Sequence, residues 1–280
     1  MLPGPTAPRG TTQVVGVIGD PVRHSRSPAI HNAAFAALGL DFVYVAFPVA
    51  AGHAADACVA LRTLGIAGCN VTMPHKEGVA AACDDLTPSA ATLRSVNTVV
   101  QRDGRLLGDS TDGPGLVAAL RDEGVDPAGR RVLVLGAGGA ARAVVAALGR
   151  AGAAVTVAAR RPEAAATAAA LADGGRAVAL SDLDPVVRAV DVVVNATPLG
   201  MQGEPPPFDP AVLTPEHFVF DTVYHPLRTP LLAAAEARGV PCAGGLGMLV
   251  HQAALAFTLW TGVAAPLPVM AAAAREGLDP

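Results

Sequence analysis

Apolar and polar residues along this chain follow two alternating patterns. Short apolar runs are typical of strands, and longer segments with apolar residues at helical spacing separate them. In the first part of the chain we predict strands at residues 14–18, 42–47, 69–72, 96–101 and 105–108, and helices at 28–39 and 54–64. Asp103-Gly104, between the last two of these strands, is typical of a two-residue hairpin turn.

The second part of the chain repeats this alternation from about Gly113 onwards. We predict strands at residues 131–135, 155–159, 191–195 and 218–221, helices at 116–121 and 140–150, an alanine-rich helix that continues to 172, and a Pro-rich loop at 200–210. Alternating strands and helices are characteristic of α/β folds with parallel sheets. We therefore predict two α/β domains, 1–112 and 113–244, with the segment 245–280 returning to complete the first.

The segment 239–274 contains no Asp, Glu, Lys or Arg. Residues 246–265 are long enough to span a membrane, which requires ~20 mostly apolar residues. However, His251 and Gln252 lie within this stretch and Gly262 interrupts it. We favour a buried helix at 248–261 with Gln252 facing a cleft, and a membrane span is the alternative.

Composition narrows the class of protein. The chain has 280 residues, of which 51% are hydrophobic and 16% charged, and this balance indicates well-buried globular domains rather than disorder. The net charge of −4, without long runs of either sign, indicates no nucleic-acid or anionic-membrane partner. The four cysteines have no metal-ligand spacing, so we expect a reduced, cytoplasmic protein without a structural metal. The Pro- and Gly-rich residues 1–12 lack the apolar core of a signal peptide and are predicted to form a loose tail.

A glycine-rich turn follows the predicted strand 131–135. Its sequence, Gly136-Ala137-Gly138-Gly139-Ala140-Ala141, has the GxGxxA pattern and precedes a predicted helix. In such a turn the first glycine permits a tight bend, the second lets the backbone approach a pyrophosphate, and the helix N-terminus favours the anion. A simple tight turn is the alternative, but the strand–turn–helix context favours dinucleotide binding.

The next strand carries the signal for the type of dinucleotide. A site that prefers NAD usually has an acidic residue at its end, whereas here the strand leads into Arg160-Arg161. Guanidinium groups bind a 2′-phosphate bidentately, so we expect NADP rather than NAD. Alternatively, the two arginines are solvated surface residues.

Lys76 is the only lysine in a chain with 19 arginines. A lysine can lose its proton where an arginine cannot, so a chemical role competes with a chance surface position. Ser25 and Ser27 precede a predicted helix, where they could cap its N-terminus or bind a carboxylate. Asp109 and Asp112 could be simple turn formers.

Eight motifs follow one another along nearly the whole chain: HSRSPAIHN, NVTMPHKE, SVNT, GDSTDG, GAGGAAR, NATPLGM, DTVYHPLRTPLL and GGLGMLVHQAA. With these motifs in this order, the chain resembles the shikimate dehydrogenase family. The resemblance implies an N-terminal substrate domain and a Rossmann-type NADP-binding domain with a deep cleft between them. It also implies reversible, NADPH-dependent reduction of 3-dehydroshikimate to shikimate, in aromatic amino acid biosynthesis.

The resemblance assigns roles to individual residues. Lys76 and Asp112 would form the catalytic pair, with the lysine as the group that transfers the proton. The substrate site would consist of Ser25, Ser27, Asn70, Thr72, Lys76, Asn97, Asp112, Tyr224 and Gln252. The cofactor site would consist of Gly136, Ala137, Gly138, Gly139, Ala140, Arg160, Arg161, Thr197, Val223, Gly245 and Met248. No metal is implied, and we interpret His24, His31, His75, His225 and His251 as local hydrogen-bonding residues.

Three departures from the family pattern are visible. Arg94-Ser95 replaces the usual Gly-Ala, Ser110 replaces an Asn, and Ala159 stands where Asn is common. None removes a proposed catalytic group. We predict a shikimate dehydrogenase acting on small molecules as a monomer or homodimer. The alternatives are a relative specific for quinate or aminoshikimate and, more remotely, a non-catalytic NADP-binding regulator.

Overall fold

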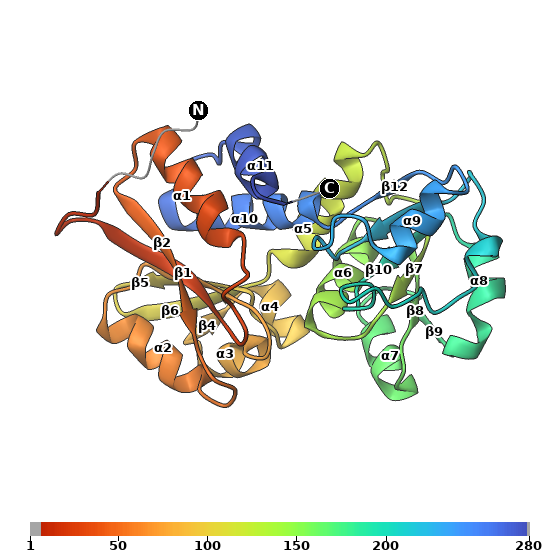
Figure 1. The fold of residues 1–280 in the computed structure, drawn as a ribbon. Helices are drawn as coiled ribbons and strands as arrows, with labels where there is room; N and C mark the ends of the chain where they lie inside the picture. The colour runs from red at the N-terminus through yellow and green to blue at the C-terminus, as the bar shows by residue number, and fades with distance from the viewer. Residues whose placement is uncertain (1–6, 279–280) are drawn as a thin grey trace. The chain divides into compact units, whose positions relative to one another are not determined.

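The computed structural model describes residues 7–278, which form two compact units (Figure 1). The first unit comprises the described residues up to Thr111 and the segment Gln252–Glu276. The second comprises Asp112–His251 and the described residues from Gly277. The sequence-based division at 112/113 and 244/245 therefore differs from these limits, since the chain leaves the second unit within helix α10 (Leu246–Thr261).

The first unit contains a six-stranded mixed sheet with the order β2-β1-β3-β5-β6-β4. Strands β1, β2 and β3 are parallel, β5 is antiparallel to β3, and β5 and β6 form the predicted hairpin, with positive φ at both Asp103 and Gly104. Its elements are β1 (Gln13–Gly19), α1 (Ser27–Leu38), β2 (Phe42–Pro48), α2 (Ala54–Thr63), β3 (Gly68–Val71), α3 (Lys76–Ala82), β4 (Asp85–Leu86), α4 (Pro88–Leu93), β5 (Thr98–Arg102), β6 (Arg105–Asp109), the end of α10, and α11 (Leu267–Arg275).

Two helical layers cover this first sheet. Helices α2 and α3 lie on one face, where side chains of α2, α3 and α4 share a core with β1, β3 and β5. Helices α1 and α11 lie on the other face with the end of α10, and Phe35 of α1 stacks on Phe257 of α10 at 5.2 Å between ring centroids. The C-terminal segment thus completes the hydrophobic core of the N-terminal unit.

The second unit is a parallel sheet with the order β12-β11-β10-β7-β8-β9. Read from the other edge, the strand order reverses beside β7, as in the doubly wound dinucleotide-binding fold. Its elements are α5 (Asp112–Asp122), β7 (Arg131–Leu135), α6 (Gly139–Arg150), β8 (Ala154–Ala158), α7 (Pro162–Ala169), β9 (Arg176–Val178), a 3-10 turn (Leu180–Asp182), α8 (Leu183–Ala189), β10 (Val192–Asn195), a 3-10 turn (Pro210–Val212), β11 (Phe218–Asp221), α9 (Pro230–Glu236), β12 (Cys242–Ala243) and the start of α10.

Side chains of β7 alternate between two hydrophobic cores. Val132 and Val134 pack with helices α5, α6 and α7, whereas Leu133 and Leu135 pack with α8 and α9. Because helices cover both faces, a central parallel strand has no polar side and its sequence is continuously apolar. This explains why the run Arg131–Leu135 identified the strand correctly.

Several sequence-based limits need correction. Helix α5 begins at Asp112, one turn earlier than expected, and α7 ends at Ala169 rather than near 172. Residues 1–6 of the predicted loose tail lie outside the described residues, but Thr11 and Thr12 are not loose, since their hydroxyls donate to the Asp41 carboxylate at 2.6 Å. Within residues 7–278, no helix is long and apolar enough to cross a membrane.

Candidate active site

The carboxyl end of β3 forms a buried amide network with the β5–β6 hairpin. Asn70 on β3 is paired with Thr98 on the antiparallel strand β5. The Nδ2 of Asn70 donates to Thr98 Oγ1 at 3.1 Å and to the carbonyl of Asn97 at 3.3 Å. Asn97 in turn donates from Nδ2 to Thr111 Oγ1 at 2.9 Å and accepts the Thr111 N–H at 2.7 Å. The structure thus brings together two of the predicted substrate ligands, Asn70 and Asn97.

Lys76 is the first residue of α3, and hydrogen bonds fix both its own carbonyl group and the residue before it. The carbonyl of Lys76 accepts the N–H of Val96 at 3.0 Å, and the preceding residue, His75, contacts the carbonyl of Val49 through Nε2 at 2.7 Å. Thr72, half-buried four residues earlier, donates its N–H to the carbonyl of Ile18 at the end of β1. These bonds fix the turn between β3 and α3, and therefore the backbone from which the Lys76 side chain extends.

Ser25 and Ser27 lie at the start of α1, but not as helix caps. The N-cap residue is Arg26, which makes no side-chain capping bond, and Ser27 is the first helical residue rather than part of the loop. Ser25 Oγ accepts the Ser27 N–H at 3.3 Å. The Arg26 guanidinium donates to the carbonyl of Ala273 at 3.0 Å and to that of Glu276, which ties this turn to the end of α11.

The remaining predicted substrate residues lie on other elements. Asp112 is the buried first residue of α5, and it directly follows Thr111, the partner of Asn97. Gln252 is buried on α10, and Tyr224 is half-buried three residues after β11. Asp112 and Tyr224 belong to the second unit, and Lys76 and Gln252 to the first.

The glycine-rich turn between β7 and α6 contains two glycines, Gly136 and Gly138, that are needed for different reasons. Gly136 has φ +116°, and a Cβ there would lie 2.8 Å from the carbonyl oxygen of Ala196. Gly138, the N-cap of α6, has φ −75°, and a Cβ there would meet no protein atom within 4 Å. Gly136 is therefore demanded by the fold, whereas Gly138 leaves open space in front of a helix N-terminus without a side-chain cap. This is the surface that a bound pyrophosphate needs, so the residues fit a dinucleotide.

Arg160 and Arg161 lie at the same edge of the sheet as this turn. Strand β8 pairs in parallel with β7, the N–H of Gly136 donates to the carbonyl of Ala158 at 2.8 Å, and both arginines are exposed just beyond Ala158. Arg161 is the N-cap of α7. Their position beside the glycine turn suits an adenosine 2′-phosphate.

A buried carboxylate, Asp221, organises the loops after β10 and β11. Its Oδ1 accepts from Asn195 Nδ2 at 2.9 Å and from the Val223 N–H at 3.1 Å, and its Oδ2 accepts from Thr229 Oγ1 at 2.6 Å. Asn195 Oδ1 accepts both the N–H and the hydroxyl of Thr197. Burial raises the pKa of Asp221 despite these bonds. Sequence reasoning proposed Thr197 and Val223 but missed Asn195 and Asp221, although both stand at the ends of predicted strands within the quoted motifs.

Gly245 and Met248 occupy the start of α10. The N–H of Gly245 donates to the carbonyl of Val223 at 3.0 Å, and a Cβ on Gly245 would collide with the carbonyl of Thr222. Met248 is buried in the core that α5 and α6 share with the sheet. The structure thus brings Gly245 and Val223 together.

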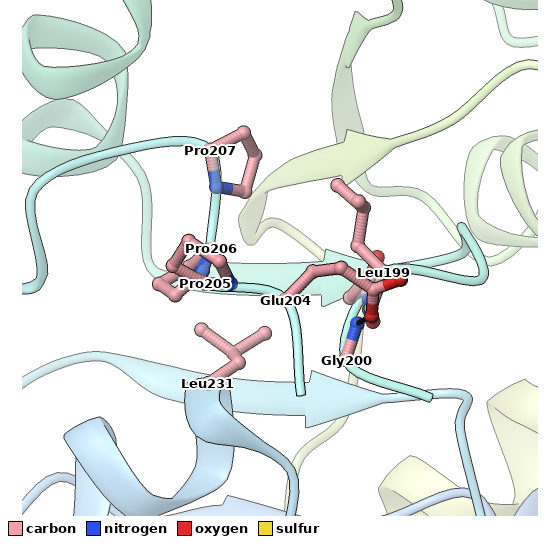
Figure 2. Close-up of a pocket in the computed structure, with 8 residues that line it drawn as sticks. Leu199, Gly200, Glu204, Pro205, Pro206, Pro207 and Leu231 are labelled. Atoms are coloured by element: carbon pink, nitrogen blue, oxygen red, sulfur yellow. Dashed lines mark hydrogen bonds between the residues drawn. The ribbon is translucent and has the colours of Figure 1, made fainter. Parts of the chain in front are cut away.

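A small pocket lies beside the loop that follows β10 (Figure 2). Pro205, Pro206, Pro207 and Leu231 line it, and the one charged lining residue, Glu204, accepts the N–H groups of Gly200 and Gln202 at 3.0 Å. The backbone N–H of Glu204 itself, followed by those of Gln202 and Gly200, lowers the pKa of Glu204. Because its carboxylate stabilises the loop and no other titratable group lines the pocket, we assign the pocket no catalytic role.

One of the histidines that we predicted to form local hydrogen bonds, His31, does not do so. His75 and His251 make local contacts, the latter to Asp122 at 2.7 Å. His31 is wholly buried with no hydrogen-bond partner at either ring nitrogen, so its assignment as a hydrogen-bonding residue is wrong. Within the described residues, no group of three or more His, Cys, Asp or Glu side chains could hold a metal ion.

Comparisons with known proteins cover most of the chain. The model described as shikimate dehydrogenase substrate binding domain matches residues 17–99, that of shikimate / quinate 5-dehydrogenase matches 119–199, and that of the shikimate 5'-dehydrogenase C-terminal domain matches 245–275. The shikimate dehydrogenase (NADP(+)) of Symbiobacterium thermophilum is 46% identical, over 97% of this chain and 96% of that protein. This chain belongs to the shikimate dehydrogenase family.

Solved structures of the family agree with the fold. The crystal structure of the Thermus thermophilus shikimate 5-dehydrogenase in complex with NADP(H) and shikimate is 39% identical, has a TM-score of 0.87, and covers 94% of this chain and 99% of that chain. A crystal structure of a shikimate dehydrogenase in complex with NADP+ has 36% identity and a TM-score of 0.92, with 99% of both chains covered. The predicted family and the two-domain α/β fold with a Rossmann-type unit are therefore confirmed.

One departure from the family pattern has a visible backbone consequence. Arg94, which stands where a shikimate dehydrogenase usually has glycine, ends α4 with φ 47°. This is the left-handed region that glycine occupies at little cost and an arginine adopts rarely. The local backbone therefore keeps the geometry of a glycine turn although the residue has changed.

Proposed function

We propose that this chain is an NADP-dependent shikimate dehydrogenase, which reversibly reduces 3-dehydroshikimate to shikimate in aromatic amino acid biosynthesis. The main support for the proposal is the 46% sequence identity, over nearly the full length of both chains, to a relative named shikimate dehydrogenase (NADP(+)). The open space at Gly138 and the two arginines beyond β8 support NADP as the cofactor. We propose further that it works in the cytoplasm, as a monomer or homodimer.

The chemistry needs a proton donor as well as a hydride donor. NADPH supplies the hydride to the ketone carbon when it is bound. Lys76, whose backbone is fixed by the turn after β3, is proposed to give a proton to the ketone oxygen and to take it back in the reverse direction. Asp112 is proposed to favour the charged form of the lysine and to hold the substrate hydroxyl.

The polar residues of the first unit are proposed to recognise the substrate. Ser25, Ser27 and Thr72 would bind the carboxylate, with Tyr224 beside them, while Asn70, Asn97 and Gln252 would bind ring hydroxyls. Asn70 and Asn97 are already oriented by a buried network, so little rotamer freedom is lost when a ligand binds. Buried polar groups of this kind reject analogues that lack a hydroxyl.

The cofactor side is proposed to bind NADP through three groups of residues. The turn Gly136, Ala137, Gly138, Gly139 and Ala140 would bind the pyrophosphate, and Arg160 with Arg161 the 2′-phosphate. Thr197, Val223, Gly245 and Met248 would lie near the nicotinamide half.

Steady-state rates test the function. Shikimate and quinate are each assayed with NADP and with NAD, and we expect the highest kcat/KM for shikimate with NADP. Faster turnover of quinate would instead assign the chain to the quinate branch of the family, which the matched shikimate / quinate model also describes. NADP binding without turnover of either acid would favour an aminated substrate or a regulator.

Two substitutions of Lys76 separate its charge from its proton transfer. Lys76→Ala is expected to lower kcat roughly 10²- to 10⁴-fold, the usual contribution of a general acid–base group. Lys76→Arg keeps the positive charge but holds its proton at all ordinary pH values, so it should be nearly as defective. Both variants should bind NADP normally. An active Lys76→Arg variant would contradict the proton-transfer role.

A further inference from the structure

Two residues of the HSRSPAIHN motif, His31 and Asn32, have no part in the proposed chemistry, yet both hold Tyr44. Asn32 donates from Nδ2 to the carbonyl of Tyr44 at 2.9 Å and accepts the Tyr44 N–H at Oδ1 at 2.8 Å. Strand β2 is an edge of its sheet, so this side-chain amide takes the place of a neighbouring strand. The backbone of Tyr44 is thereby fixed to α1.

The ring of Tyr44 is held equally firmly. His31 stacks on it with parallel ring planes and 4.5 Å between centroids, and Trp260 lies at 5.9 Å. Burial lowers the pKa of His31 to about 3, so the imidazole is neutral and acts as a flat apolar surface. Tyr44 is 1% exposed. Because the ring cannot move in this packing, the position of the Tyr44 hydroxyl is fixed.

The hydroxyl of Tyr44 meets two side chains that are proposed to bind substrate. It donates to Asn70 Oδ1 at 2.7 Å, and the side chain of Ser27 interacts with it closely enough to oppose part of the rise in its pKa. Burial raises the pKa of Tyr44 well above its usual value, so the phenol keeps its proton and remains a donor. One buried hydroxyl thus connects the aromatic cluster around Tyr44 to Asn70 at the end of β3.

The bond to Asn70 determines which way the amide of Asn70 points. With Oδ1 accepting from Tyr44, Nδ2 is directed to Thr98 and to the carbonyl of Asn97. An amide offers two acceptor and two donor positions. The protein contacts of Asn70 use both donors and one acceptor, so a ligand hydroxyl would donate to the second lone pair of Oδ1.

We propose that Tyr44 is a positioning residue for the substrate, because its hydroxyl sets the orientation of the Asn70 amide. The inference rests on the proposed function. Because Tyr44 is buried and its hydroxyl donates to Asn70, it acts through Asn70 rather than through a contact of its own with the ligand. Because its whole support lies within the first unit, it affects recognition of the polyol acid and leaves the cofactor untouched.

Tyr44→Phe removes the hydroxyl and keeps the ring stack, so it isolates this role. We expect KM for shikimate to rise roughly 5- to 100-fold, the range for loss of a buried hydrogen-bond partner. We expect KM for NADP to stay within about twofold, and kcat to change less than KM for shikimate. The assay is run well below the melting temperature of the variant, at a temperature where its circular dichroism spectrum equals that of the wild type.

Phe35→Leu provides the matched control. Phe35 belongs to the same aromatic cluster, is 1% exposed and has no polar atom to orient a ligand. This change should lower the melting temperature and leave KM for shikimate unaltered. An unchanged KM in folded Tyr44→Phe, or an equal rise in both variants, would overturn the positioning role. Failure of the wild type to oxidise shikimate would instead reject the proposed function, which this comparison detects separately.

Discussion

The two glycines of the β7–α6 turn provide a test in which the same substitution has opposite consequences. Gly136→Ala adds a methyl group where φ is +116° and the new Cβ lies 2.8 Å from the Ala196 carbonyl oxygen. Gly138→Ala adds one where φ is −75° and no protein atom lies within 4 Å. One change therefore acts on the fold, and the other on what binds in front of it.

The expected magnitudes follow from these environments. A non-glycine residue in a sparsely populated backbone region costs ~1–3 kcal/mol, and the close approach to Ala196 adds to this. Gly136→Ala should therefore lower the melting temperature by roughly 5–10 °C. Gly138→Ala should leave stability unchanged or raise it by up to ~1 kcal/mol, because alanine has less conformational freedom in the unfolded chain. In contrast, it should weaken NADP binding at least tenfold, or ~1.4 kcal/mol.

Thermal melting of the free protein and titration of NADP by fluorescence measure the two effects. The decisive result is Gly138→Ala, because its fold is expected to be intact. If this variant bound NADP as tightly as the wild type, the cofactor phosphates would not approach Gly138 and the proposed site would be wrong. If it melted as early as Gly136→Ala, the open space in front of α6 would be contradicted.

Three further predictions concern single groups. Asp221→Ala leaves three buried donors without their acceptor at ~1–3 kcal/mol each, so unfolding experiments should show a loss of roughly 3–9 kcal/mol. Asp221→Asn should lose only ~1–2 kcal/mol, because the Thr229 hydroxyl can turn to accept from the new amide; equal losses would contradict this account. Arg160→Ala should raise KM for NADP far more than KM for NAD, and an equal rise in both would remove Arg160 from the phosphate site. The folded-state pKa values of Asp84 and Asp191 lie below their usual values, chiefly through bonds from the Leu106 N–H and the Arg131 guanidinium, respectively. Their stabilising contribution is present above pH ~4 and lost as pH falls through the folded values, so acid melts should show declining stability in that window and Asp191→Asn should flatten it.

The sequence predicted those parts of the fold in which local pattern and tertiary environment agree. Strand β7 is buried on both faces, and its continuous run of apolar residues is typical of a buried strand. Asp103 and Gly104 both adopt the positive φ values that their turn requires. Short helices were missed. Helices α3 and α4 have only 7 and 6 residues, too few for a helical period to be visible.

The start of α1 and the state of His31 could not be predicted because both depend on contacts far away in sequence. Sequence reasoning assigned Ser27 to a loop, since Pro28 looked like the first helical residue. His31 looked like a hydrogen-bonding residue, but its surroundings are aromatic rings from β2 and α10. Whether a histidine makes hydrogen bonds therefore depends on the residues packed around it, which the local sequence does not reveal.

Tyr44 and Asp221 show what kind of functional residue a motif search overlooks. Each is buried, and each carries a polar group whose burial opposes ionisation, as their raised pKa values show. For Asp221, an apolar group of similar volume would avoid the cost of burying a charge, so stability alone does not explain a carboxylate there. Both groups instead fix side chains or loops that the proposed function uses: Tyr44 fixes Asn70, and Asp221 fixes the loop of Val223. We therefore expect substitutions that keep their shape and remove their hydrogen-bonding ability to affect ligand binding more than stability at Tyr44, and stability as well as cofactor binding at Asp221.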